Sequence, residues 1–188
     1  MRSWREFFPL ALRRLDRRAS VRLAEAARRN PIIKGVALVI SHSGDGVIWT
    51  SAAVGAFIGL PENRQPVLYA ALAMYLAAIL VWVGKMIVRR DRPSPPLPKR
   101  LFILPGHDPF SFPSGHAARA ASIAASAHLF LDLPVLNAVR WPLTIWAMGV
   151  CWARVSLSAH YILDVVVGAI IGLITVVLSP LLWSAVVG

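Results

Sequence analysis

The sequence predicts an all-α membrane protein, a polytopic bundle of about five transmembrane helices that follows an N-terminal amphipathic segment. Of its 188 residues, 57% are hydrophobic. The mean hydropathy of +0.62 lies well above that of soluble domains. The apolar residues occur in runs of roughly membrane-spanning length, and charged or proline-rich stretches separate these runs. We therefore expect a single membrane-embedded domain over residues 1–188.

The charge of the chain points to lipid headgroups rather than to nucleic acid. The formal net charge is +11. Long apolar runs separate the basic residues, however, and these are not interleaved with aromatic residues on an exposed fold. We expect no nucleic-acid partner and place the basic residues beside anionic headgroups. The single cysteine, Cys151, excludes an intramolecular disulfide.

Residues 1–34 form a basic segment in which arginines alternate with apolar side chains. The apolar residues recur at about the 3.6-residue period of a helix. This pattern predicts one or two amphipathic helices that lie at the headgroup level of the membrane. A solvated basic tail is the alternative.

Residues 31–60 are apolar except for the polar segment 41–46. Neither apolar piece has the roughly 20 residues that a crossing needs. We expect residues 32–40 to form a helix at the interface or dipping into it. Residues 46–60 would then form most of a short first span.

The later spans are separated by turn and loop residues. The prolines of residues 93–113 exclude a regular helix and predict a loop. A short turn is expected over residues 132–140. The third span is rich in Ala and Ser, which suits a helix packed closely against other helices. The five expected crossings are residues 46–60, 66–88, 114–131, 141–158 and 162–187.

Lys85 and Arg92 form the first of three polar clusters, each at a place where an apolar run meets a polar segment. The two residues are seven apart, close to two helical turns, so both can face inward from the end of the second span. An ammonium and a forked guanidinium neutralise and hydrogen-bond a dianionic phosphate. The alternative is a pair of ordinary membrane-flanking charges.

Ser114, Gly115 and His116 form the second cluster, directly after Pro113. This pattern predicts a helix that starts with Ser114 as its N-cap. The free backbone N–H groups of a helix start bind anions, and glycine allows close approach. His116 would project into that site and donate a proton to a departing oxygen. An ordinary cap beside an interfacial histidine is the alternative.

Arg154, His160 and Asp164 form the third cluster, where ionisable residues near span ends are costly unless they are paired or functional. The four-residue step from His160 to Asp164 places both on one helical face. The carboxylate can then hold one ring nitrogen and leave the other free as a nucleophile. A purely structural His–Asp pair remains the alternative. With five crossings, all three clusters lie on the same side of the membrane.

The three clusters resemble the three motifs of the type 2 phosphatidic acid phosphatase superfamily. The motifs are Lys85, six residues and Arg92-Pro93; Pro113-Ser114-Gly115-His116; and Arg154, five residues, His160, three residues and Asp164. The resemblance covers residues 85–164, in order and at the expected spacings. Ala153 stands where the family usually has serine, which is not a main catalytic group, so we expect a minor effect.

This resemblance implies a phosphatase that uses neither a metal nor another cofactor. His160 would attack phosphorus to form a phosphohistidine, with Asp164 orienting and charging the ring. His116 would protonate the leaving alkoxide and then activate water. The residues implied in phosphate binding and transition-state stabilisation are Lys85, Arg92, Ser114, Gly115 and Arg154.

Three further polar residues lie on the expected active-site side. Asp45 and His42 precede the first span. We expect Asp45 to cap its helix, because Asp is a preferred helix starter, with a headgroup contact as the alternative. Arg119 lies about one helical turn past His116, so it can contact a headgroup.

The distribution of charge predicts that the N-terminus and the site face the cytoplasm across the plasma membrane. The expected site side carries ten basic residues up to Lys34, as well as those around residues 85–100. The opposite side carries only Arg64 and Arg140, and acidic neighbours balance them. Positive charge favours the cytoplasmic side. A crossing by residues 32–42 would instead separate the N-terminus from the site.

A site at the interface, beside an apolar loop, suits a phosphomonoester or diphosphate on a lipid. A cytoplasmic site fits a biosynthetic polyprenyl phosphate such as decaprenylphosphoryl phosphoribose 5-phosphate, or phosphatidylglycerol phosphate. A periplasmic site would fit an undecaprenyl diphosphate phosphatase of carrier-lipid recycling. A non-catalytic lipid-binding protein is a further alternative, which the presence of both histidines and Asp164 disfavours.

Overall fold

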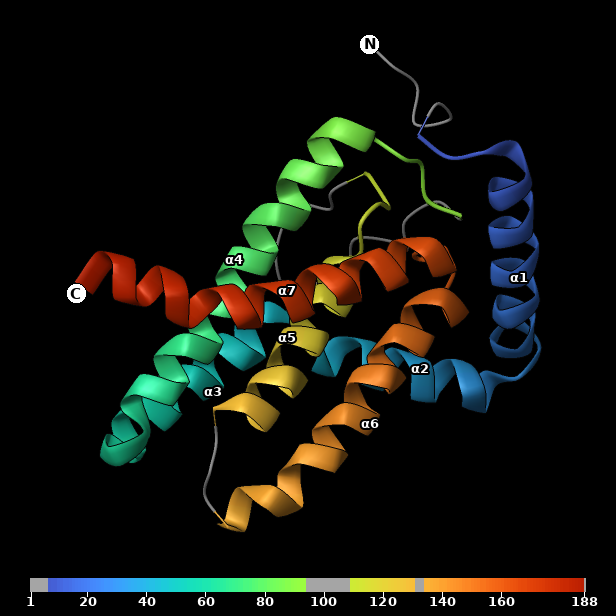
Figure 1. Ribbon diagram of the computed structural model, residues 1–188. Coiled ribbons are helices and arrows are strands. Elements are labelled where there is room, and N and C mark those ends of the chain that lie inside the picture. Colours follow the sequence, from blue (N-terminus) through green and yellow to red (C-terminus); the bar gives the residue numbers. More distant parts are fainter. Residues whose placement is uncertain (1–6, 94–108, 131–133, 188) are drawn as a thin grey trace.

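The computed structural model describes residues 7–93, 109–130 and 134–187, and these residues form an all-helical bundle (Figure 1). Most of the proline-rich loop, residues 94–108, lies outside the described residues. The helices are α1 (Leu10–Arg29), α2 (Pro31–Ser43), α3 (Gly46–Gly59), the short 3-10 helix η2 (Pro61–Asn63), α4 (Arg64–Val88), α5 (Gly115–Leu129), α6 (Pro134–Ser156) and α7 (Ile162–Val187).

Helix α5 lies at the centre of the bundle, where it packs against α4, α6 and α7 (Figure 1). One small side chain after another is buried along it, and the small size lets the neighbouring helices approach closely. The prediction that this Ala- and Ser-rich segment is packed between helices is therefore confirmed. Its buried residues are Ala117, Ala118, Ala120, Ser122, Ala124, Ser126 and Ala127.

Two glycines on α7 allow the closest of these contacts. A Cβ atom at Gly168 would collide with the backbone of Ser114, and one at Gly172 with the backbone carbonyl of Ala118. The two glycines are one helical turn apart, so they form one smooth strip on α7. This strip brings the start of α5 against the first turns of α7, where Ser114 N donates to the carbonyl oxygen of Asp164 at 2.9 Å.

Helices α4 and α7 are each long and apolar enough to cross a membrane. Helices α2 and α3 meet that condition only together, as a pair bent by 47° at a short break. The break consists of Gly44 and Asp45. The predicted spans at residues 66–88 and 162–187 thus correspond to α4 and α7. The predicted short first span forms the second half of this bent pair.

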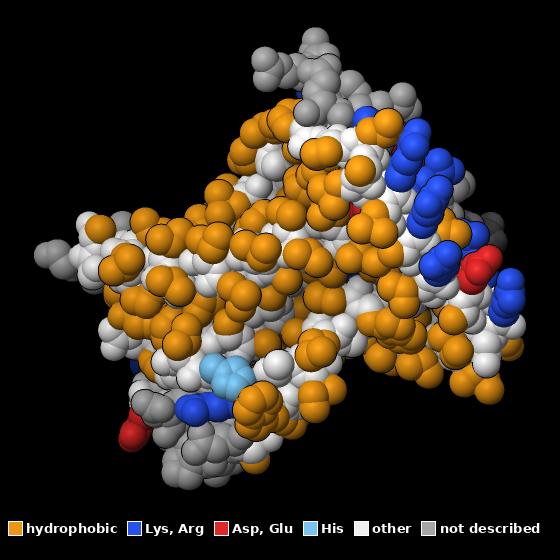
Figure 2. All heavy atoms as spheres, turned by 45° about the vertical axis from the view of Figure 1, so that its right-hand side comes forward, with side chains coloured by type: hydrophobic (Ala, Val, Ile, Leu, Met, Phe, Trp, Pro, Cys, Tyr) orange, Lys and Arg blue, Asp and Glu red, His pale blue; other side chains and the backbone are white. Residues whose placement is uncertain are grey.

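Helix α1 lies across the turn between α6 and α7 (Figure 1). The Arg28 Nη2 atom lies 3.1 Å from Ser158 Oγ, and Ser20 Oγ accepts from the backbone N–H of Ile162 at 3.0 Å. The side chains that α1 buries are Asp16, Ser20, Ala24 and Ala27, which lie on one face. Its arginines point mostly outward. Figure 2 shows basic side chains gathered along one edge of the molecule, on the side of α1.

The predicted turn over residues 132–140 is wrong, because α6 already begins at Pro134. Proline fits the first turn of a helix, where its missing N–H has no intrahelical partner. Pro142 lies inside the same helix. The helix thus starts at one proline and continues through the other.

Candidate active site

The three polar clusters of the sequence converge at one end of the bundle. This end is formed by the last turn of α4, the first turn of α5 and the turn between α6 and α7, and the α2–α3 break also reaches it (Figure 1). The side chains of Lys85, Ser114, Arg154, His160 and Asp164 are all buried there. Residues up to 79 positions apart in the sequence thus share one site.

His160 lies in the turn before α7 and has only 2% of its surface exposed. Its Nδ1 atom donates to the carbonyl oxygen of Ser111 at 2.7 Å. Because a carbonyl can only accept, Nδ1 carries the proton of the neutral ring and Nε2 keeps its lone pair. His160 is therefore held in the tautomer that a nucleophile requires.

Asp164 lies farther from the ring than the sequence suggested. Its Oδ2 atom is 3.8 Å from His160 Nδ1, beyond hydrogen-bonding distance. The expectation that both residues share one helical face is wrong, because α7 begins at Ile162 and His160 precedes it. Asp164 Oδ2 instead accepts from the backbone N–H of Tyr161 at 2.9 Å. The His160 ring is therefore oriented by the Ser111 carbonyl, and the Asp164 carboxylate lies nearby without a hydrogen bond to the ring.

The pKa of His160 is held well below its usual range, chiefly because the ring is buried. The positive charges of Arg154, Arg92 and Lys85 lower it further. A neutral imidazole surrounded by three cations is suited to attack a phosphate dianion, since the cations attract the phosphate and the ring keeps its lone pair.

Lys85 reaches the site from the last turn of α4, and Arg92 reaches it from the segment that follows this helix. The prediction that two turns of one helix separate them is wrong, because α4 ends at Val88 and Arg89 adopts a left-handed conformation with φ of 49°. Lys85 Nζ donates to the carbonyl oxygen of Phe110 at 2.9 Å. Arg92 Nη1 donates to that of Ala159 at 3.2 Å.

Ser114 is the N-cap of α5, as the sequence predicted, and its side chain accepts from the backbone N–H of Ala117. Gly115 is the first residue of the helix, so its backbone N–H has no intrahelical partner. His116 follows, with 24% of its side chain exposed. This helix start offers an anion both free amides and the positive end of the helix dipole.

Arg90 is a buried residue that the sequence did not distinguish from the charges around it. Its Nη1 atom lies 2.7 Å from Asp164 Oδ1, and its Nη2 atom lies 2.7 Å from Asp16 Oδ2. Asp16 Oδ1 also accepts from the backbone N–H of Leu163 at 3.0 Å. Helix α1 thereby fixes the carboxylate beside His160. Asp16 shares its face of α1 with Ser20, Ala24 and Ala27, and no sequence pattern marked it for this role.

The α2–α3 break supplies further polar contacts. Ser41 Oγ accepts from Arg154 Nη1 at 2.8 Å, and the Gly44 carbonyl oxygen accepts from Arg119 Nη1 at 2.9 Å. Asp45 stands at the N-cap position of α3, but its side chain makes no capping bond, so the expected capping role is wrong. Its carboxylate bonds to His116 instead, with Oδ1 2.9 Å from Nε2.

A cavity of about 180 Å³ opens beside the site between α4 and α5. Lys85, Gly115 and Arg119 line its polar end, and Met74 and Trp82 are among the apolar residues that line the rest. This amphiphilic lining suits a molecule with a charged headgroup and an apolar chain. Among the described residues, no group of three His, Cys, Asp or Glu side chains is placed to hold a metal ion.

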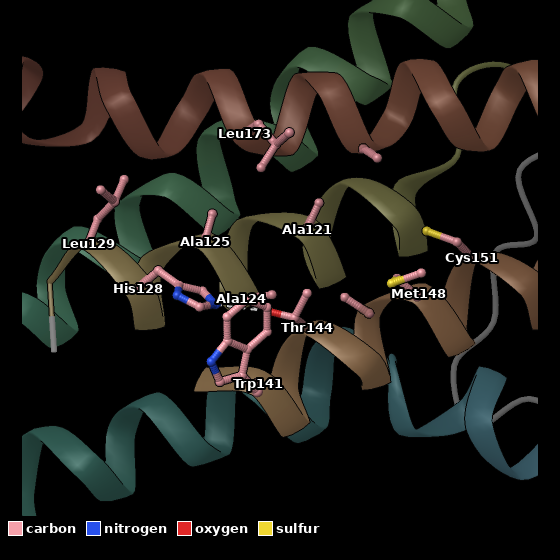
Figure 3. A pocket seen from close by; sticks show the side chains of 12 residues that line it. Ala121, Ala124, Ala125, His128, Leu129, Trp141, Thr144, Met148, Cys151 and Leu173 are labelled. Atoms are coloured by element: carbon pink, nitrogen blue, oxygen red, sulfur yellow. Dashed lines mark hydrogen bonds between the residues drawn. The ribbon is translucent and has the colours of Figure 1, made fainter. Parts of the chain in front are cut away.

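A second hollow, a groove of about 610 Å³, lies between α5, α6 and α7 (Figure 3). Apolar side chains such as Leu173 and Met148 line it, and at one end the His128 ring packs edge-on against Trp141. His128 Nε2 lies 2.9 Å from Thr144 Oγ1. None of the residues of the three motifs lines this groove. The groove is therefore separate from the three polar clusters.

The chain is similar to known proteins in sequence and in fold. Residues 66–186 match the sequence model of the PAP2 superfamily. A decaprenylphosphoryl-5-phosphoribose phosphatase of Mycobacterium tuberculosis is 30% identical over 134 residues, which cover 71% of each chain. The crystal structure of Aquifex aeolicus LpxE shares 27% identity and a TM-score of 0.66, over 86% of this chain and 92% of that one. A PAP2-type phosphatidylglycerolphosphate phosphatase of Bacillus subtilis, 24% identical, has the same fold with a TM-score of 0.78, over 97% of this chain and 90% of that one.

Proposed function

Because this chain belongs to the PAP2 superfamily, we propose that it is a membrane lipid phosphatase that acts through a phosphohistidine intermediate. Its substrate is a phosphomonoester or diphosphate on a polyprenyl-linked or glycerol phospholipid. The observation that carries the proposal is the placement of His160, buried in its Nδ1–H tautomer among Lys85, Arg92 and Arg154. That arrangement combines a nucleophile with the charges that a phosphate needs.

In the first step, Nε2 of His160 attacks phosphorus while the bond from phosphorus to the lipid oxygen breaks. The three cations, the Ser114 hydroxyl and the Gly115 amide hold the nonbridging oxygens and stabilise the charge that develops on them. His116 gives its proton to the leaving oxygen. The nearby carboxylate of Asp164 stabilises the positive charge that the His160 ring acquires.

In the second step, His116 takes a proton from water, and the water oxygen attacks phosphorus. The phosphorus–nitrogen bond breaks, inorganic phosphate leaves and His160 regains its lone pair. His116 thus serves as the general acid in the first step and as the general base in the second.

The cavity between α4 and α5 supports a lipid substrate. Its polar end holds Lys85 and Arg119, and apolar residues of α4 continue from there along the bundle. A phosphorylated headgroup fits the first part, and an acyl or prenyl chain fits the second. Decaprenylphosphoryl phosphoribose 5-phosphate and phosphatidylglycerol phosphate are the substrates we propose first. Undecaprenyl diphosphate is the alternative.

The bundle crosses the plasma membrane five times, through α3, α4, α5, α6 and α7, and α2 lies at the interface or dips into it. The short helix α5, with 15 residues, crosses in the middle of the bundle, where the other helices shield it. This arrangement is supported by α1, which lies at the same end of the bundle as the site. The basic face of α1 lies at the headgroup level on the cytoplasmic side, where positive charge is favoured.

Release of inorganic phosphate from a panel of lipid phosphates tests the proposed function. Wild type should release phosphate from at least one acyl or prenyl phosphate, and His160→Ala should release none. His116→Ala should be slower than wild type by roughly 100-fold or more, the usual contribution of a general acid. Equal turnover by all three proteins would contradict the mechanism.

A further inference from the structure

The carboxylate of Asp45 is directed toward His116 although it lies at the start of a helix. A helix-starting aspartate usually accepts hydrogen bonds from its own helix, and Asp45 makes no such bond. Its Oδ1 atom lies 2.9 Å from His116 Nε2, and its Oδ2 atom lies 3.2 Å from His42 Nδ1. The carboxylate therefore does not cap its own helix and lies within hydrogen-bonding distance of two imidazole rings instead.

The α2–α3 break is fixed in place by its neighbours. Arg119 Nη1 donates to the carbonyl oxygen of Gly44 at 2.9 Å. Trp49 Nε1 donates to the carbonyl oxygen of Ser43 at 2.8 Å, and Trp146 Nε1 donates to the Ser43 hydroxyl, also at 2.8 Å. Donors from α3, α5 and α6 therefore hold this irregular segment of backbone.

Two glycines let the break approach the site. A Cβ atom at Gly44 would lie 3.4 Å from His116 Cδ2 and 3.2 Å from a methyl group of Val150. A Cβ atom at Gly46 would lie 3.0 Å from Arg119 Nη2. All three distances are at or below ordinary packing distance, so a side chain at either glycine would crowd His116 or Arg119.

We infer that Asp45 is a positioning residue of the phosphatase reaction, which orients His116 and keeps it ready to donate a proton. Since a carboxylate only accepts, His116 Nε2 carries a hydrogen. The proton that His116 exchanges with substrate and water is therefore the one on Nδ1. Asp45 acts on the reaction through His116.

The Asp45 carboxylate also balances the positive charges around His116. Arg154 and Arg119 both place a positive charge near the His116 ring. The Asp45 carboxylate faces the same ring, with Oδ1 2.9 Å from Nε2, and its negative charge offsets theirs. Without Asp45, the positive charges of Arg119 and Arg154 would face His116 without this neighbouring carboxylate to offset them.

The proton balance of the cycle follows from this geometry. As His160 Nε2 bonds to phosphorus and the lipid oxygen leaves, the Nδ1 proton of His116 passes to that oxygen. As water attacks and the phosphorus–nitrogen bond breaks, one water proton returns to His116 Nδ1. The Nε2 hydrogen stays on the bond to Asp45 throughout.

The inference rests on the proposed function, and Asp45→Asn tests it, because the amide keeps the shape of the side chain and removes its charge. We compare kcat/KM for dioctanoyl phosphatidic acid, whose alkoxide must be protonated to leave, with that for p-nitrophenyl phosphate, whose phenolate leaves unaided. We expect roughly a 10- to 100-fold loss for the first substrate and less than about a threefold loss for the second. The basic limb of the pH profile for the lipid should also move to lower pH.

His42→Gln is the matched control, because it removes the other partner of Asp45 and leaves the bond to His116 intact. An equal loss on both substrates with Asp45→Asn would assign Asp45 a purely structural role and overturn the inference. An unchanged kcat/KM for the lipid would overturn it as well. Wild-type turnover that His160→Ala abolishes tests the proposed function separately, so the two failures are distinguishable.

Discussion

The guanidinium of Arg90 holds the carboxylate of Asp164, with 2.7 Å between Nη1 and Oδ1 and almost no solvent exposure of either side chain. The other end of the same guanidinium bonds to Asp16 on α1, and its centre lies 4.0 Å from the centroid of the Tyr161 ring. One arginine outside the three motifs therefore joins the N-terminal helix to the acidic residue beside the nucleophile.

Replacement of Arg90 by Met should destabilise the fold and lower activity together. Two buried carboxylates would lose their counter-charge, a change that typically costs about 3–5 kcal/mol. Thermal unfolding followed by circular dichroism in detergent measures the first effect, and phosphate release measures the second. Arg89→Met is the control, because Arg89 is exposed and should tolerate the change. Equal melting temperatures of the two variants would contradict this role of Arg90.

The glycine strip on α7 should be intolerant of larger side chains. Gly172→Val would push α7 away from the backbone of Ala118 and disturb the contact between the starts of α5 and α7. We expect a loss of roughly 1–3 kcal/mol or more, as for other overpacked interiors, together with a loss of activity. Gly55→Ala, where a Cβ meets open space, should retain both. Thermal unfolding and phosphate release distinguish the two variants.

The low pKa of His160 predicts how activity depends on pH. Protonation removes the lone pair that attacks phosphorus, so activity is lost as the pH falls through this pKa. Because the pKa lies well below 6.5, the loss that His160 causes should also lie below that pH. Lys85→Met removes one of the cations that lower the pKa, so the acid limb of kcat/KM should move to higher pH. Both proteins are measured with the same substrate, so the ionisation of the substrate contributes equally to the two pH profiles. An acid limb that stays in place, or moves down, would contradict the electrostatic account.

Cysteine labelling tests the proposed orientation. In a Cys151→Ala background, Glu62→Cys and Arg29→Cys place one exposed thiol at each end of the bundle. In intact cells, a membrane-impermeant maleimide should label Glu62→Cys, and it should label Arg29→Cys only after the membrane is opened. The reverse pattern would put the site on the outer side of the membrane.

The sequence predicted the residues of the motifs better than the contacts between them. Apolar run lengths predicted α4 and α7, and Ala and Ser content predicted the packed position of α5. The predicted end of the second span at residue 88 matches the end of α4, but the left-handed conformation of Arg89 was not predicted, because such a conformation at an arginine has no sequence pattern. The sequence also did not identify Asp16 as the partner of Arg90 or Asp45 as the partner of His116. In each pair the two residues are more than 70 positions apart in the sequence. Only packing of the helices creates such contacts.

A covalent phosphate on His160 is the central claim of the mechanism, and trapping it is the most direct measurement. Wild type and His160→Ala are mixed with short-chain phosphatidic acid that carries a radiolabelled phosphate, and quenched during turnover. Wild type should yield a label that is stable in alkali, labile in acid and located on the peptide that contains His160. A label of equal amount in His160→Ala, or lipid hydrolysis by that variant at the wild-type rate, would contradict the mechanism.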